Sequence, residues 1–173
     1  MPTAADRLLN LLEEGGAQYR LIRHAPEGRT ERASLLRGHP PEQAAKCIVV
    51  RVKISKRQVR FVLAVVPGDR RVDLDRIRES VGGRDAGFAD RQTAERLAGT
   101  VSGTIMPFAF DAELELIVDP ALLETTDIFF NAAALDRSVA LRTTDYLRLA
   151  RPTLLDIAQG PGLDRTAPIE QVA

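Results

Sequence analysis

The chain has 173 residues, of which 45% are hydrophobic and 28% charged, as in an ordinary soluble domain with a real core. Its 24 basic and 24 acidic side chains balance, which argues against a protein that holds a long nucleic-acid duplex, because such proteins use a basic excess to neutralise phosphates. One cysteine and two histidines exclude a disulfide framework and a metal-ligand cluster. No apolar run approaches the roughly 20 residues that span a bilayer. We expect a cytoplasmic protein with no signal peptide, cofactor, membrane contact or DNA partner.

The first third of the chain predicts three helices and one strand. A capping pattern at Thr3–Asp6, followed by leucines at helical spacing, predicts a helix that ends at Gly15. Alternating residues predict a short strand over 19–23. Thr30 is expected to cap a second helix and Pro41 to begin a third, short one.

The strongest strand signal follows. Two near-continuous apolar runs, 47–52 and 61–66, are joined by the polar, alternating segment 53–60. This pattern predicts a hairpin at the centre of a sheet, because strands with no polar face must be covered on both sides.

The remaining segments are predicted from the same signals. They comprise helices beginning at Asp73 and Asp90, a strand over 114–118, a helical turn over 120–124, short strands at 129–130 and 138–141, and a last helix capped by 143–145 and ending at Ala150. Residues 1–160 are expected to form a single domain, and residues 161–173 a flexible C-terminal tail. Irregular alternation of strands and helices predicts an α/β (α+β) fold: a mixed, largely antiparallel, barrel-like sheet flanked by helices.

Lys46 and the segment 99–108 are the first candidates for chemistry. Lys46 directly precedes the first central strand, where it is either a solvated lysine or a pocket cation that binds phosphate or polarises a carbonyl. Segment 99–108 combines two glycines and a proline, so its amides could approach the oxyanion of an attacked ester. The alternative is an ordinary connection between a helix and a strand.

Other reactive side chains give weaker signals. Cys47 lies inside an apolar strand, which favours an inert thiol over a nucleophile. Arg51, Lys53 and Arg60 lie on the hairpin, where basic residues either protect a solvated edge or contact phosphates.

Five segments carry more information together than any one carries alone. In chain order they are residues 44–50, 63–74, 94–99, the G-x-x-x-P loop 103–107, and 116–119. In this order they resemble the YbaK/ProX family of aminoacyl-tRNA editing domains, which are related to the insertion domain of bacterial prolyl-tRNA synthetase. The resemblance spans about residues 5–158.

The resemblance implies a hydrolase that acts in trans on the ester between a small noncognate amino acid and the 3′ end of a tRNA, with a tRNA(Pro)-like acceptor end and prolyl-tRNA synthetase as expected partners. It implies attack by a water, activated with help from the terminal ribose hydroxyl, while loop amides hold the carbonyl; neither a metal nor a side-chain nucleophile is needed. Lys46 falls on the family's essential lysine. The candidate catalytic residues are therefore Lys46, Gly103, Thr104, Ile105, Met106 and Pro107.

Substrate contacts are assigned to a second set of residues. The candidates for binding the amino acid are His24, Thr30, Cys47, Asn131 and Ser138, and those for binding tRNA are Arg51, Lys53 and Arg60. The segment 131–138 departs from the family's glycine-rich stretch and lacks the histidine typical of the alanyl-specific branch. Alanine, serine, threonine and 2-aminobutyrate all remain open as substrates, because an editing pocket excludes what is too large. The alternatives to an editing enzyme are a non-catalytic tRNA-binding or regulatory module of the same fold, or a hydrolase of other small esters.

Overall fold

Eight strands form two sheets in residues 1–160, the part of the chain that this computed structural model describes. The larger sheet has the order β4-β2-β3-β5-β8, and the smaller one the order β1-β7-β6. The strands are β1 (Tyr19–Arg23), β2 (Ala45–Lys53), β3 (Val59–Pro67), β4 (Asp85–Phe88), β5 (Leu114–Val118), β6 (Asp127–Ala134), β7 (Arg137–Arg142) and β8 (Thr153–Leu154).

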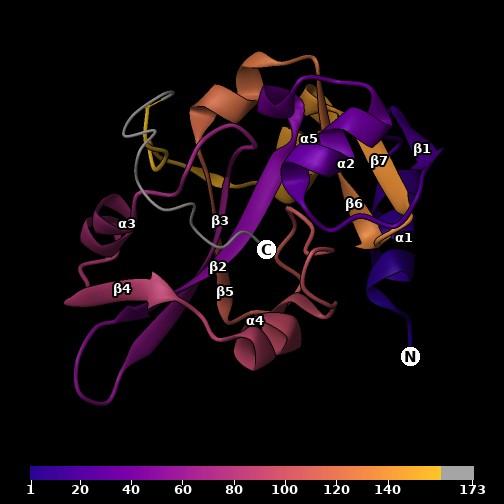
Figure 1. Ribbon diagram of the computed structural model, residues 1–173. Helices are drawn as coiled ribbons and strands as arrows, with labels where there is room; N and C mark the ends of the chain where they lie inside the picture. Colours follow the sequence, from indigo (N-terminus) through magenta and orange to yellow (C-terminus); the bar gives the residue numbers. More distant parts are fainter. Residues whose placement is uncertain (161–173) are drawn as a thin grey trace.

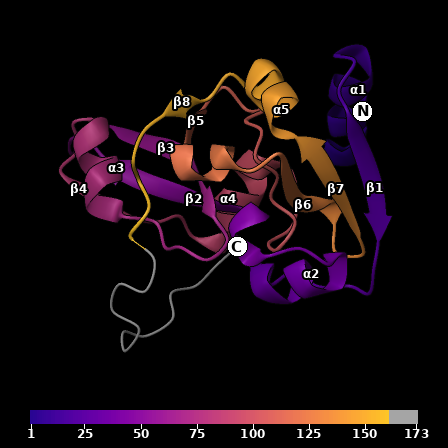
Figure 2. The same cartoon turned by 90° about the horizontal axis from the view of Figure 1, so that it is seen from above.

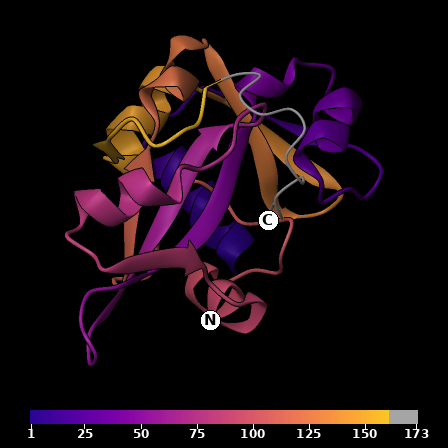
Figure 3. The same ribbon diagram turned by 60° about the vertical axis from the view of Figure 1, so that its left-hand side comes forward.

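The predicted central hairpin is confirmed and organises the larger sheet. β2 and β3 pair antiparallel from Ala45 opposite Pro67 to Lys53 opposite Val59. β4 adds antiparallel to β2, whereas β5 adds parallel to β3 and β8 parallel to β5. The hairpin end protrudes from the body at the lower left of Figures 1 and 3.

The three-stranded sheet is antiparallel and lies beside the first residues of β2. A parallel bridge between Ala44 and Phe129 links the two sheets, and Figure 2 shows them side by side. The described strands do not close into a barrel. The predicted mixed α+β class is therefore confirmed at the level of class, without the barrel.

Helices and the segment 155–159, the C-terminal strap, cover the larger sheet. The helical segments are α1 (Ala4–Glu14), α2 (Thr30–Arg37), α3 (Leu74–Ser80), α4 (Arg91–Ala98), α5 (Thr143–Ala150) and two 3-10 turns, η1 (Pro41–Gln43) and η2 (Pro120–Glu124). No helix in the described part of the chain is long and apolar enough to cross a membrane.

The alternation of side chains along β2 divides the core into two clusters. Cys47 and Val49 face a cluster shared with α1, α4, α5 and the smaller sheet. Ile48 and Val50 face the opposite cluster, which α3 and the strap near Ile157 cover. Both faces of the hairpin are buried, which explains why its strands are apolar almost without interruption, as predicted.

Local structure agrees with the sequence signals in most places. The capping box at Thr3 and Asp6 forms as predicted. Thr30 does not cap α2, because Arg29 occupies the cap position and Thr30 is the first helical residue. Residues 143–145 likewise lie within the first turn of α5 and do not cap it. The tail predicted for residues 161–173 lies outside the described residues.

Candidate active site

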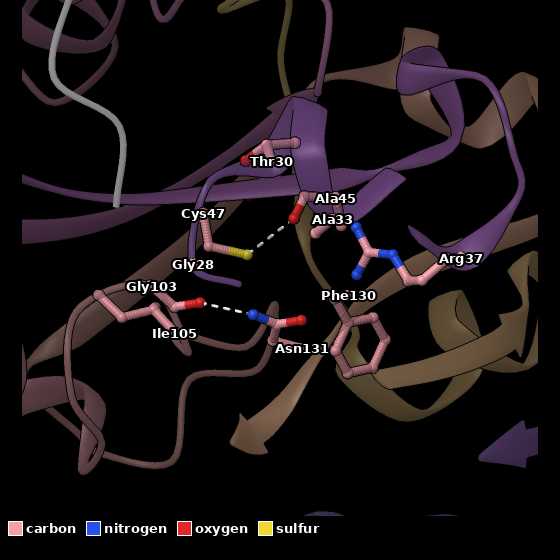
Figure 4. A pocket seen from close by; sticks show the side chains of 10 residues that line it. All are labelled: Gly28, Thr30, Ala33, Arg37, Ala45, Cys47, Gly103, Ile105, Phe130 and Asn131. Carbon is pink, nitrogen blue, oxygen red and sulfur yellow. Dashed lines mark hydrogen bonds between the residues drawn. The ribbon is translucent and has the colours of Figure 1, made fainter. Parts of the chain in front are cut away.

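A small pocket opens where α2, the start of β2, the middle of β6 and the G-x-x-x-P loop meet (Figure 4). Its hollow measures about 330 Å³, a volume that includes space open to solvent. The lining residues are Gly28, Thr30, Ala33, Arg37, Ala45, Cys47, Gly103, Ile105, Phe130 and Asn131. These residues come from four separate parts of the sequence, so the fold creates a site that no local motif contains.

The G-x-x-x-P loop is fixed at several points. The buried Tyr146 donates a hydrogen bond to the carbonyl of Pro107 at 2.7 Å, and the Thr104 hydroxyl donates to the carbonyl of Val101 at 2.6 Å. Ile105 and Met106 are both buried in the core cluster. A loop held in this way can present its backbone to a ligand with little reorganisation.

Glycine is required at the first position of this loop. Gly103 has φ of +88°, a left-handed conformation that side chains disfavour. A Cβ there would lie 3.0 Å from the Cα of Gly28. The absence of a side chain at Gly103 therefore lets the loop close against the segment at Gly28 on the pocket wall.

Asn131 joins these two segments. Its side-chain amide donates to the carbonyl of Gly103 at 2.8 Å and to the carbonyl of Glu27 at 2.9 Å. The register between β6 and β7 shifts after Asn131, and Ala133 in the shifted part has φ of +56°. Such bulges re-aim side chains near functional sites, and here the bulge directly follows the residue that holds the loop.

Ser138 lies behind Asn131 and connects it to the side chains of His24 and Arg37. The Ser138 hydroxyl lies 3.0 Å from Oδ1 of Asn131 and 2.6 Å from Nε2 of His24. It also accepts a hydrogen bond from Nη1 of Arg37 at 3.1 Å. Since Ser138 is 0% exposed, it supports the pocket wall from behind.

Arg37 contributes the charge of the pocket. Burial lowers the pKa of its guanidinium to about 10, so the group is still a cation at neutral pH. No carboxylate of the described residues lies within salt-bridge distance of it, and its Nε is buried without a hydrogen-bond partner. Figure 4 shows the guanidinium reaching inward between Ala33 and Phe130.

Cys47 lines the pocket as an uncharged thiol. It is 4% exposed, and its Sγ lies 3.5 Å from the carbonyl of Ala45. Burial raises the pKa of this thiol far above its usual range, so the thiolate that a nucleophile needs is not formed at neutral pH. This agrees with the sequence-based preference for an inert thiol.

The predicted site residues fall into two groups. Thr30, Cys47, Gly103, Ile105 and Asn131 line the pocket together, whereas His24, Ser138, Thr104, Met106 and Pro107 lie outside its lining. The described residues contain no group of three or more His, Cys, Asp or Glu side chains that could hold a metal.

Lys46 is buried, with 7% of its surface exposed, and is not a lining residue. It is the second residue of β2 and pairs with Val66. Strand alternation places it on the face of Ile48, opposite to Ala45 and Cys47. Lys46 is therefore not the solvated lysine that its position before a strand suggests.

The three basic residues predicted to contact tRNA have different surroundings. Arg51 and Lys53 are exposed on the same face of β2 as the pocket residue Cys47. Arg60 forms an ion pair with Glu115, in which its Nε donates at 2.8 Å.

Sequence reasoning missed Arg37. Its position four residues after Ala33 and three after Ser34 offered a signal, because this spacing places the three residues on one face of a helix. Ala33 and Ser34 are the buried residues of α2, so a cation on their face points inward.

The sequence is similar to those of known proteins. The model of the aminoacyl-tRNA editing domain family matches residues 24–149. The Multifunctional Ser/Thr-tRNA deacylase ProXp-y of Escherichia coli (strain K12) is 40% identical over 151 residues, which cover 87% of this chain and 90% of that protein. A proline–tRNA ligase of Trichlorobacter lovleyi is 26% identical over 129 residues, 72% of this chain but 22% of the ligase.

Solved structures show the same fold. The crystal structure of a candidate trans-editing enzyme for prolyl tRNA synthetase superposes with a TM-score of 0.75 at 20% identity, covering 92% of this chain and 99% of the other. That of a hypothetical protein gives a TM-score of 0.78 at 18% identity, covering 88% and 99%.

This chain belongs to the aminoacyl-tRNA editing domain family. The predicted family is confirmed, as is the predicted class of activity, hydrolysis of an aminoacyl-tRNA ester by a trans-editing deacylase.

Proposed function

We propose that this protein removes serine and threonine from mischarged tRNA, and that the pocket beside the G-x-x-x-P loop binds the aminoacyl group. The observation that carries the proposal is the joining of Gly103 to the pocket wall by Asn131, which holds the loop against the space where a small side chain fits. The 40% identical relative is a Ser/Thr-tRNA deacylase by name, which supports the choice among small amino acids.

The reaction needs an attacking water and a place for the negative charge that develops on the carbonyl oxygen. Water adds to the ester carbon, and the bond to the ribose oxygen breaks as that oxygen takes up a proton, giving free amino acid and tRNA. The Thr104 amide already donates to the carbonyl of Val101 at 3.0 Å. We therefore assign the oxyanion to the amides of Gly103 and Ile105, whose residues line the pocket.

The substrate is proposed to be a tRNA(Pro)-like acceptor end, charged in error by prolyl-tRNA synthetase in the cytoplasm. The similarity to part of a proline–tRNA ligase and to a candidate trans-editing enzyme for prolyl tRNA synthetase supports this choice. Residues 1–160 are taken as the editing domain. Lys46 is kept in the proposal because the family's essential lysine falls at this position; since it lies outside the pocket lining, on the opposite face of β2 from Cys47, its role is to be tested by substitution.

Deacylation of a panel of aminoacyl-tRNAs tests the proposal. Seryl- and threonyl-tRNA(Pro) are expected to be hydrolysed, with Lys46→Ala at least about 100-fold slower, a loss on the scale of removing a group that stabilises the transition state. An active Lys46→Ala enzyme would remove Lys46 from the mechanism. Tight tRNA binding without turnover of any ester would replace the enzyme with a binding module.

A glycine pair tests the loop. Gly103→Ala introduces a Cβ 3.0 Å from Gly28, whereas the Cβ of Gly99→Ala meets no atom of residues 1–160 within 4 Å. Both glycines have positive φ, +88° and +74°. We expect Gly103→Ala to lower kcat by about 100-fold and Gly99→Ala to change it little, because only the first displaces the loop from the pocket. Equal losses in the two variants would mean that backbone strain, rather than loop position, controls the rate.

A further inference from the structure

Arg37 has hydrogen-bonding capacity that residues 1–160 do not use. A guanidinium has five N–H donors. Within the described residues, the side chain of Arg37 has one hydrogen bond, from Nη1 to Ser138, and its Nε is buried without a partner. A buried donor left unsatisfied costs free energy, which a ligand that supplies an oxygen acceptor would recover.

We propose that Arg37 is the specificity-determining residue of this pocket and donates a hydrogen bond to the side-chain hydroxyl of the bound serine or threonine. This inference rests on the proposed function, since it names the feature of the substrate that the same pocket recognises.

The surroundings of Arg37 favour a hydroxyl on a small side chain. The lining includes Ala33, Ala45, Cys47, Ile105 and Phe130, which leave room for a small side chain only, while most of the surface exposed inside the pocket belongs to polar atoms. Both side-chain N–H groups of Asn131 already donate to backbone carbonyls. Of the lining side chains, Arg37 and Thr30 keep a donor for a ligand, and Arg37 is the charged one, whose stronger hydrogen bond can tell a hydroxyl from a methyl group of nearly equal size.

Charge also orients the substrate. The α-amino group of an aminoacyl ester is cationic near neutral pH and is repelled by the guanidinium. The amino acid is then favoured in the orientation that turns its side chain, and not its amine, toward Arg37.

Two pairs of substrates isolate the hydroxyl. Serine differs from alanine, and threonine from 2-aminobutyrate, by a hydroxyl group on the same carbon skeleton. The wild-type protein is expected to deacylate the hydroxylated member of each pair faster. Arg37→Met is expected to lower kcat/KM for serine and threonine by about 10- to 100-fold, the value of a hydrogen bond to a charged donor, and to leave alanine and 2-aminobutyrate within about threefold.

A matched variant on the same helix controls for charge and folding. Arg32→Met removes an exposed guanidinium of α2 whose only ion pair within the described residues is a 3.9 Å contact with Glu27, and it should leave all four rates unchanged. Thermal unfolding of both variants shows whether Arg37→Met folds, and Arg37→Lys, which keeps the charge but not the planar donors, should restore the serine rate only in part.

The outcomes separate this inference from the proposed function. If the wild-type protein hydrolyses none of the four esters, the proposed function fails. If the protein is active but Arg37→Met slows all four esters equally, the inference fails and the function stands, with Arg37 then contacting a tRNA phosphate or supporting the wall. A wild-type enzyme without preference for the hydroxyl also overturns the inference.

Discussion

His39 shows how burial of one side chain links stability to pH. Its ring stacks on Phe129 with centroids 3.8 Å apart, and its Nδ1 lies 2.8 Å from the carbonyl of Pro40. Its Nε2 is buried and has no hydrogen-bond partner in the described part of the chain. A second proton would have to enter at Nε2. Burial, together with the nearby positive charges of Arg37 and Arg20 and against the opposing effects of the Pro40 carbonyl and Glu42, lowers the pKa of His39 from 6.5 to about 4.

We therefore expect His39 to reduce stability in acid. Between pH 6.5 and about 4 the unfolded chain binds a proton that the folded chain does not, so the free energy of unfolding falls as the pH falls. His39→Phe keeps the stacked ring and removes the titration. Its melting temperature should fall less than that of the wild type from pH 7 to pH 4, and parallel curves would show that His39 does not titrate in this way.

Individual residues were the hardest feature to predict from sequence. Lys46 could be placed at the start of β2, but its burial follows from the strap and helices that cover that face, which no local pattern reports. Asn131 was a candidate, yet its partners Glu27 and Gly103 lie 104 and 28 residues away. Conversely, the inert state of Cys47 was predictable, because a thiol inside a buried strand loses solvation wherever that strand packs.

At the scale of elements, the turn from β6 to β7 carries strain that a glycine would relieve. Ala133 has φ of +56°, and a left-handed conformation costs a side-chain-bearing residue roughly 1–2 kcal/mol. The alanine at position 133 therefore reduces stability at the bulge next to Asn131.

Replacement of Ala133 by glycine should stabilise the protein. We expect Ala133→Gly to raise the free energy of unfolding by about 0.5–1 kcal/mol, the relief of strain less the added entropy of the unfolded chain. Ala132→Gly, one residue earlier and 3% exposed, should instead lower it by about 1 kcal/mol. Urea denaturation measures both. A loss of stability in Ala133→Gly would mean that the turn does not hold its left-handed geometry in solution.

Elements with strong local signals were predicted, and those that depend on a neighbour were not. The β2–β3 hairpin is set by its own apolar runs and polar turn. β4 has four residues and β8 has two, and each exists because a strand already in the sheet offers it an edge. Pairing of this kind leaves no periodic pattern in so short a segment.

For the whole molecule, the question is how a protein of zero net charge holds a polyanion. Exposed Arg51 and Lys53 follow Cys47 along one face of β2, with Arg51 about 13 Å from Cys47 at the usual rise per residue. Arg60 is already paired with Glu115, so its charge is largely compensated. A tRNA end whose amino acid lies in the pocket could therefore place its phosphates over Arg51 and Lys53. Such binding would need no basic surface elsewhere on the protein.

Charge reversal tests this path. Arg51→Glu with Lys53→Glu is expected to raise KM for seryl-tRNA at least about 10-fold and to flatten the slope of log kcat/KM against log salt by up to about 2, because two phosphate contacts are lost. Lys56→Glu with Arg57→Glu makes the same change in net charge farther along the hairpin, at exposed residues of its turn, and should have the smaller effect. Hydrolysis of seryl-adenosine, which lacks the acceptor stem, should be unchanged in both. If the two double variants lose tRNA use equally, long-range attraction by the whole hairpin, rather than contact along the face of β2, guides the substrate to the pocket.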